Sequence, residues 1–226
     1  MHVFCFKNNY RLRRIAIPSS IISIGDDSFS ACASLVQVTI PHSIKTIKKK
    51  AFQGCISLEQ VLFENPSSVT SIESFAFDEC SSLKQIEIPS SVTSIGDFCF
   101  NLCSSLKQIS ISTSITNIGE SAFNGCSSLK QISFDTSAKV SSIKPDTFCK
   151  CSSLKKISIP SSVKFLGHHT FNDCSSLTEI EIPSYVTSID NYCFAGCSSL
   201  IQILIPSSVT SIGEGVFVYC GSLKEI

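Results

Sequence analysis

The chain has 226 residues, of which 43% are hydrophobic and 16% charged, and its formal net charge at pH 7 is zero. This balance is typical of a globular protein and excludes a general electrostatic attraction to nucleic acids or membrane surfaces. No run of about 18 apolar residues occurs, which excludes a membrane-spanning helix. The N-terminal stretch MHVFCFKNNYRLRR lacks the roughly 7–15 apolar residues of a signal peptide.

The chain begins with an imperfect unit over residues 6–18, in which Asn9 stands where later units have Cys. Nine units follow, each with a Phe, a Cys three residues later and a Leu three residues after that. Their cysteines are 23 or 25 residues apart: Cys32, Cys55, Cys80, Cys103, Cys126, Cys151, Cys174, Cys197 and Cys220. Such a period indicates a solenoid, because no unit buries its apolar face alone. We predict a single domain, residues 1–226, of about ten repeats of 23–25 residues, the first degenerate.

Each unit contains the same elements in the same order, as residues 80–103 illustrate. The alternation in LKQIEI, residues 83–88, predicts a β-strand with one buried face. Pro89 ends that strand because it has no N–H to donate, and VTSI, residues 92–95, predicts a second short strand. Phe100 and Cys103 are three residues apart, which predicts a short helical turn. The serines are interpreted as fillers of exposed turns.

Two units carry two extra residues, after Phe63 and Phe134, and we expect both insertions at a surface turn. The last unit stops in LKEI, residues 223–226, within a predicted strand. This predicts an uncapped C-terminal end with Phe217, Leu223 and Ile226 exposed. An unpaired strand edge with apolar neighbours allows self-association of the chain.

The repeat, written Cys-x-x-Leu-x-x-Ile-x-Ile-Pro-x-x-Val-x-x-Ile-Gly-x-x-Ala-Phe-x-x-Cys, resembles that of the BspA-like surface antigens of bacteria and parasitic protists. The resemblance covers residues 6–226. It implies a leucine-rich repeat solenoid of the α/β type, with a parallel β-sheet on one face. It also implies a secreted or cell-surface adhesin that binds host or matrix proteins. No export signal or membrane anchor is visible, so a cytoplasmic leucine-rich repeat scaffold or adaptor, suited to many free thiols, is the alternative.

The residues that could carry chemistry are not arranged for it. The nine repeated cysteines are interpreted as buried free thiols, since stacked equivalent positions hold their Cβ atoms near the strand spacing of about 4.8 Å, too far for disulfides. The other cysteines and the four histidines lack metal-ligand spacing. Motifs of hydrolases, P-loop proteins and zinc proteases are missing. We therefore predict no metal, no cofactor and no enzymatic activity.

The candidate binding site is the exposed face of the predicted strands. Its residues are Gln85, Glu87, Gln108, Ser110, Gln131, Ser133, Lys156, Ser158, Glu179 and Glu181. A basic edge precedes these strands and consists of Lys84, Lys107, Lys130 and Lys155. Two interpretations stay open: the glutamine amides hydrogen-bond to one another along the sheet, or the face binds a protein partner. No aromatic stripe lies there, which argues against nucleic-acid bases or sugars as ligands.

Overall fold

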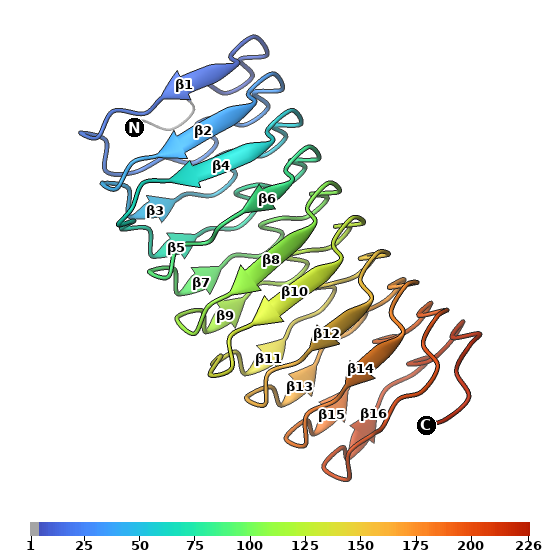
Figure 1. Ribbon diagram of the computed structural model, residues 1–226. Coiled ribbons are helices and arrows are strands. Elements are labelled where there is room, and N and C mark those ends of the chain that lie inside the picture. The colour runs from blue at the N-terminus through green and yellow to red at the C-terminus, as the bar shows by residue number, and fades with distance from the viewer. Residues whose placement is uncertain (1–4) are drawn as a thin grey trace.

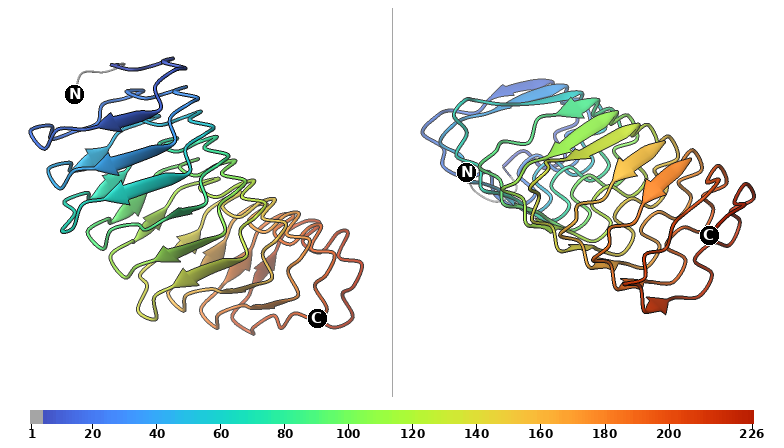
Figure 2. Two further views of the ribbon diagram at one scale, coloured as in Figure 1. Left: turned by 45° about the horizontal axis from the view of Figure 1, so that its top comes forward. Right: turned by 60° about the horizontal axis from the view of Figure 1, so that its bottom comes forward.

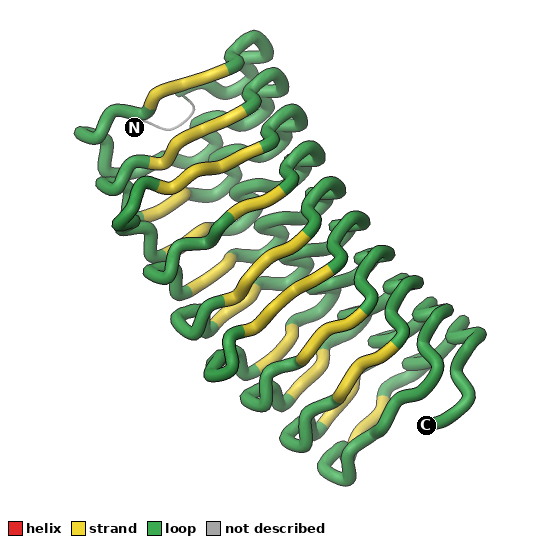
Figure 3. The backbone as a smooth tube through the Cα atoms, in the orientation of Figure 1, coloured by secondary structure: helices red, strands yellow, loops and turns green. Residues whose placement is uncertain are grey.

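The computed structural model describes residues 5–226, which form one stack of coils with the two termini at opposite ends (Figure 1). Each coil follows the one before it along the stack, as two further views show (Figure 2). Between residues 37 and 189, each coil contributes one short strand to each of two rows, and turns connect the rows (Figure 3). A single solenoid of parallel strands is therefore the observed architecture.

The first row forms the parallel sheet expected from the LKQIEI segments. Its strands pair in the orders β1-β2-β4-β6 and β8-β10-β12-β14. Equivalent residues lie opposite each other, so that Gln131 of β10 faces both Gln108 of β8 and Lys156 of β12. The strands are β1 (Arg14–Ala16), β2 (Gln37–Ile40), β4 (Gln60–Phe63), β6 (Gln85–Ile86), β8 (Gln108–Ile111), β10 (Gln131–Phe134), β12 (Lys156–Ser158) and β14 (Glu179–Glu181).

The second row confirms the short strand predicted from VTSI. Its members are two residues long and pair in parallel in the orders β3-β5-β7-β9 and β11-β13-β15-β16. They are β3 (Thr46–Ile47), β5 (Ser71–Ile72), β7 (Ser94–Ile95), β9 (Asn117–Ile118), β11 (Ser142–Ile143), β13 (Phe165–Leu166), β15 (Ser188–Ile189) and β16 (Ser211–Ile212). Each coil thus closes around the core from two sides.

The core consists of stacked columns of identical residues. The phenylalanine rings stack nearly parallel from Phe6 to Phe217, with centroids 5.1–5.8 Å apart. The eight rings from Phe29 to Phe194 in this column are fully buried. Stacked rings add to the free energy gained by burying their area. The phenylalanine column therefore runs the length of the solenoid as its central apolar support.

The repeated cysteines form a second column with a specific hydrogen-bond role. Each Sγ donates to the main-chain carbonyl of the phenylalanine one coil earlier, at 3.1–3.3 Å. Cys126, for example, donates to the carbonyl of Phe100. A thiol is small enough for the core and still satisfies a buried acceptor. This contact explains why Cys, rather than Ala, occupies the position.

The predicted helical turn is wrong: no helix occurs among residues 5–226 (Figure 3). The residues two before and two after each core phenylalanine have positive φ, as Phe98 (55°) and Leu102 (57°) do around Phe100. Left-handed residues interrupt the run of right-handed dihedrals that an α-helix needs. The freed amides point to the next coil instead, and the N–H of Phe100 donates to the carbonyl of Ala122 at 2.8 Å.

The serines are more than turn fillers, which corrects a second expectation. In five coils, a serine directly precedes the core-facing Val or Ile at the position of Val92 and donates to a main-chain carbonyl one coil earlier, at 2.6–2.8 Å. Ser114, for example, donates to the carbonyl of Val92. Serines that directly follow the repeated cysteines make longer contacts of the same kind, such as Ser104 to Ser81 at 3.3 Å. These hydroxyls satisfy carbonyls that would otherwise lack partners between coils.

Candidate interaction surface

The ten predicted site residues all lie on one face and all are exposed. In β8, Gln108 and Ser110 point outward while Ile109 and Ile111 are buried, as the two-residue period of a strand requires. The same holds for the other strands of the first row, and we call their outward side the strand face. Glu87 belongs to it although β6 ends at Ile86.

The glutamines of the strand face do not form the amide ladder that one of the two interpretations required. Gln60 lies opposite Gln85, and Gln108 lies opposite Gln131. No hydrogen bond joins their side-chain amides in the described part of the chain, so the expected amide ladder is not formed. The side-chain contacts present are Ser133 to Ser110, at 3.0 Å, and an ion pair between Lys156 and Glu179, at 3.1 Å. The glutamine amides are therefore available to a partner.

A first hollow of about 540 Å³ lies over the beginning of β2, β4, β6 and β8. An ion pair crosses its rim, where Nζ of Lys84 lies 2.7 Å from Oε2 of Glu59. Gln37 and Gln60 each lie five residues after a repeated cysteine, as Gln85 does. This shared spacing was the sequence signal that they line the same hollow. The lining residues are Val36, Gln37, Glu59, Gln60, Lys84, Gln85, Lys107 and Gln108.

A second hollow of about 390 Å³ opens where β4 and β6 separate, lined by residues 60–67 and 85–91. The two strands pair only at Gln60–Gln85 and Val61–Ile86. The coil with the second insertion behaves in the same way, since β10 pairs with β12 at only two positions. An insertion after the strand thus coincides with shortened pairing to the next coil, a consequence that residue spacing did not reveal.

The second hollow is acidic. Glu64 and Glu87 line it together with Gln60 and Gln85. The backbone N–H and the imidazole of His42 both contact Oε2 of Glu64 at 3.0 Å, and these contacts lower the pKa of that carboxyl. The two hollows lie at opposite ends of β4 and β6, so this part of the strand face offers a basic rim at one end and carboxylates at the other.

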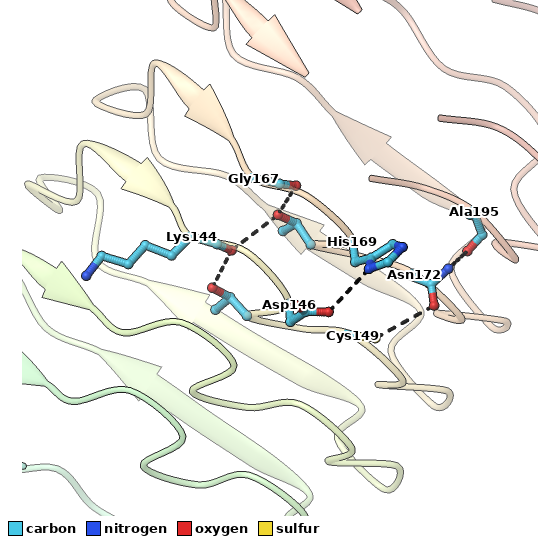
Figure 4. A network of polar contacts seen from close by, with 9 residues as sticks. Lys144, Asp146, Cys149, Gly167, His169, Asn172 and Ala195 are labelled. Carbon is cyan, nitrogen blue, oxygen red and sulfur yellow. Dashed lines mark hydrogen bonds and ion pairs between the residues drawn. The ribbon is translucent and has the colours of Figure 1, made fainter. Parts of the chain in front are cut away.

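A polar network lies away from the strand face, on the turns that carry the core phenylalanines (Figure 4). Oγ1 of Thr170 donates to the carbonyl of Gly167 at 2.6 Å and approaches that of Lys144 at 3.3 Å. Nδ1 of His169 lies 3.6 Å from Oδ1 of Asp146. Each contact joins a turn to itself or to a neighbouring coil, so the network ties turns together.

The buried thiols are not activated nucleophiles. Burial raises the pKa of Cys126 to about 12, and desolvation raises that of Cys103 and Cys174 well above the usual value. A thiol in such surroundings stays protonated and unreactive at neutral pH. Residues 5–226 also hold no group of three His, Cys, Asp or Glu side chains placed to bind a metal ion.

Comparisons with known proteins agree with this geometry. A family model described as "BspA type Leucine rich repeat region" matches residues 1–130 and 132–226, in six copies. No curated protein sequence matches the chain significantly. In the described part of the chain, no helix could cross a lipid bilayer.

Solved structures with the same fold come from several bacteria. A leucine-rich repeat protein from Bacteroides ovatus is 29% identical, with a TM-score of 0.60, and the match covers 98% of this chain and 74% of that one. The pneumococcal vaccine antigen PcpA is 24% identical, with a TM-score of 0.54 over 94% and 71% of the two chains. A leucine-rich repeat protein from Eubacterium ventriosum is 20% identical, with a TM-score of 0.51 over 95% and 84%. The last two show the fold alone.

Proposed function

The chain belongs to the BspA-type leucine-rich repeat family, and from this premise we propose that it is a non-enzymatic protein-interaction module whose strand face binds the partner. The observation that carries the proposal is the row of exposed glutamine side chains, which make no hydrogen bonds to one another although they lie opposite each other. Exposed amides that are not hydrogen-bonded to one another can both donate to and accept from a partner. The two hollows on the same face add the relief that an interface needs.

We further propose that the module acts at the cell surface, as an antigen or adhesin that binds a host or extracellular-matrix protein. Family membership supports this, and a pneumococcal vaccine antigen shares the fold. The free thiols, which favoured a cytoplasmic scaffold, lose their weight as an argument. Most of them are buried, and burial makes a thiol inert in an oxidising compartment as well as in a reducing one. Antibody labelling of intact cells tests the location, and labelling only after permeabilisation supports the scaffold.

Site-specific photo-cross-linking tests the binding face. A photoreactive residue replaces Gln131 on the strand face in one variant and, in a matched control, the exposed Thr116, which directly precedes β9 in the second row of strands. Both variants are irradiated on a panel of immobilised extracellular-matrix proteins. We expect a cross-linked product from position 131 and none from position 116. Equal yields from both positions would refute the assignment of the strand face.

A further inference from the structure

A row of lysines runs along the edge of the strand face on four consecutive coils. We call Lys84, Lys107, Lys130 and Lys155 the basic row; all four side chains are exposed. Backbone contacts fix their stacking, because the N–H of Lys107 donates to the carbonyl of Lys84 at 3.2 Å and that of Lys130 to Lys107 at 2.9 Å. Lys155 continues the row, since its neighbour Lys156 lies opposite Gln131.

The basic row is mostly unneutralised. Lys84 pairs with Glu59 at 2.7 Å, but no acidic side chain of residues 5–226 forms an ion pair with Lys107, Lys130 or Lys155. Like charges on adjacent strands, about 4.8 Å apart, destabilise a sheet. The fold tolerates this repulsion at consecutive positions, although serine or threonine would have avoided it. Within residues 5–226, three of the four lysines therefore have no acidic side chain as an ion-pair partner, and an acidic partner could supply one.

The groups around the basic row can donate hydrogen bonds, and the one carboxylate at the first hollow, Glu59, is already paired with Lys84. Gln85 and Gln108 line the first hollow beside Lys84 and Lys107. Ammonium groups at the edge and amide N–H groups in the hollow together suit a polypeptide, whose carboxylates and main-chain carbonyls accept from both. Arginine, whose planar fork favours phosphate, is missing from the row and from the lining of both hollows. Aromatic rings that would stack on sugars are missing from the row and from the lining of the first hollow.

We propose that the basic row binds an acidic segment of a protein partner, with carboxylates at Lys107, Lys130 and Lys155 and main-chain carbonyls at Gln85 and Gln108. The inference rests on the proposed interaction function and specifies the chemistry of the partner. Charge attraction of this kind raises the association rate and selects against basic partners. It also makes binding sensitive to salt, because these side chains are exposed to solvent.

Fluorescently labelled poly-L-glutamate is the probe, and its anisotropy on titration with the full chain is the readout. The test variant is K107E/K130E. The matched control is K45E/K164E, which reverses two exposed lysines outside the strand face and changes the net charge equally. We expect K107E/K130E to weaken binding about tenfold and the control to weaken it less than about twofold, as the loss of two exposed charge pairs implies. Thermal unfolding of both variants verifies that they are folded.

Each alternative outcome overturns the inference. Failure of the wild-type chain to bind poly-L-glutamate overturns it, as does an equal loss in both variants. Tighter binding of heparin, lost in K107E/K130E, would assign the row to a sulfated glycan and exclude the acidic polypeptide. Cross-linking from position 131 in the K107E/K130E background separates this inference from the proposed function. An undiminished cross-link overturns only the acidic partner, whereas no cross-link in any background counts against the interaction module itself.

Discussion

Truncation of Phe123 tests the idea that the phenylalanine column supports the solenoid. Its ring is fully buried and stacks on Phe100 at 5.5 Å and on Phe148 at 5.7 Å. Phe123→Ala removes both contacts and leaves a cavity in a coil held on two sides, so we expect a loss of about 3–5 kcal/mol in the free energy of unfolding. Phe217→Ala is the matched control, because Phe217 is half-buried and stacks only on Phe194, at 5.8 Å. We expect it to cost about 1–2 kcal/mol, in proportion to its smaller buried area.

Urea titration measured by circular dichroism gives both values. With a slope of about 2–3 kcal/mol per molar urea, as expected for a chain of this size, Phe123→Ala lowers the midpoint by about 1–2.5 M. Phe217→Ala should lower it by less than about 1 M on the same slope. Nearest-neighbour coupling between coils explains the difference, since an interior coil has two interfaces and the last has one. Equal midpoints for the two variants would show that the column does not carry the stability.

Three further predictions follow from the contacts between coils. Ser114→Ala should lower the free energy of unfolding in urea by about 1 kcal/mol, because the carbonyl of Val92 loses its donor. The control Thr113→Ala, at an exposed position, should lower it by less than about 0.5 kcal/mol. Equal losses would exclude the hydrogen-bond role of Ser114. All thirteen cysteines should react with a maleimide in denaturant. In the folded chain the buried cysteines should stay unlabelled up to pH 9, because burial raises the pKa of their thiols. Labelled Cys126 in a mass spectrum of the folded protein would contradict this prediction. The polypeptide of residues 1–226 should self-associate in sedimentation through its last coil, where Ile226 is 70% exposed and Tyr219 83% exposed; Y219K/I226K should be monomeric, and an unchanged distribution would exclude that end.

The columns of the core were predictable because their period is strict. Phe, Cys and Leu keep their offsets through nine units, and all point inward in the first eight. The turn around the phenylalanine was predicted incorrectly, because an i, i+3 apolar pair fits both a helix and a turn with left-handed residues. A signal was present in Gly54, Gly125 and Gly196, which occupy one of the two positive-φ positions. The other six units hold non-glycine residues there, and the bonds to the next coil compensate the strain.

The candidate site was predictable as a face but not as a shape. Alternation assigned all ten residues to the exposed side, since a strand has only two sides. The hollows depend on how far neighbouring strands pair. QIEI at residues 85–88 and QISI at residues 108–111 have the same pattern, yet β6 has two residues and β8 has four. The coil before β6 contains the first insertion. How far β4 and β6 pair depends on both coils together, so the residue pattern of one coil does not predict it.

Positions that repeat in the core and positions that repeat on the strand face differ in what they contact. In stretches such as IPSSVTSIG, valine and isoleucine pack in the core, and serine and threonine donate to main-chain carbonyls one coil earlier, as Ser91 does to Val69 and Thr93 to Thr70. A change at one of these contact positions therefore disturbs the interface with a neighbouring coil. The side chains of the strand face point to solvent, yet one position holds Gln on five consecutive coils, from Gln37 to Gln131, before it changes to Lys156 and Glu179. The lysines of the basic row also repeat although their side chains are exposed, and a partner that binds along this row would contact four coils at once.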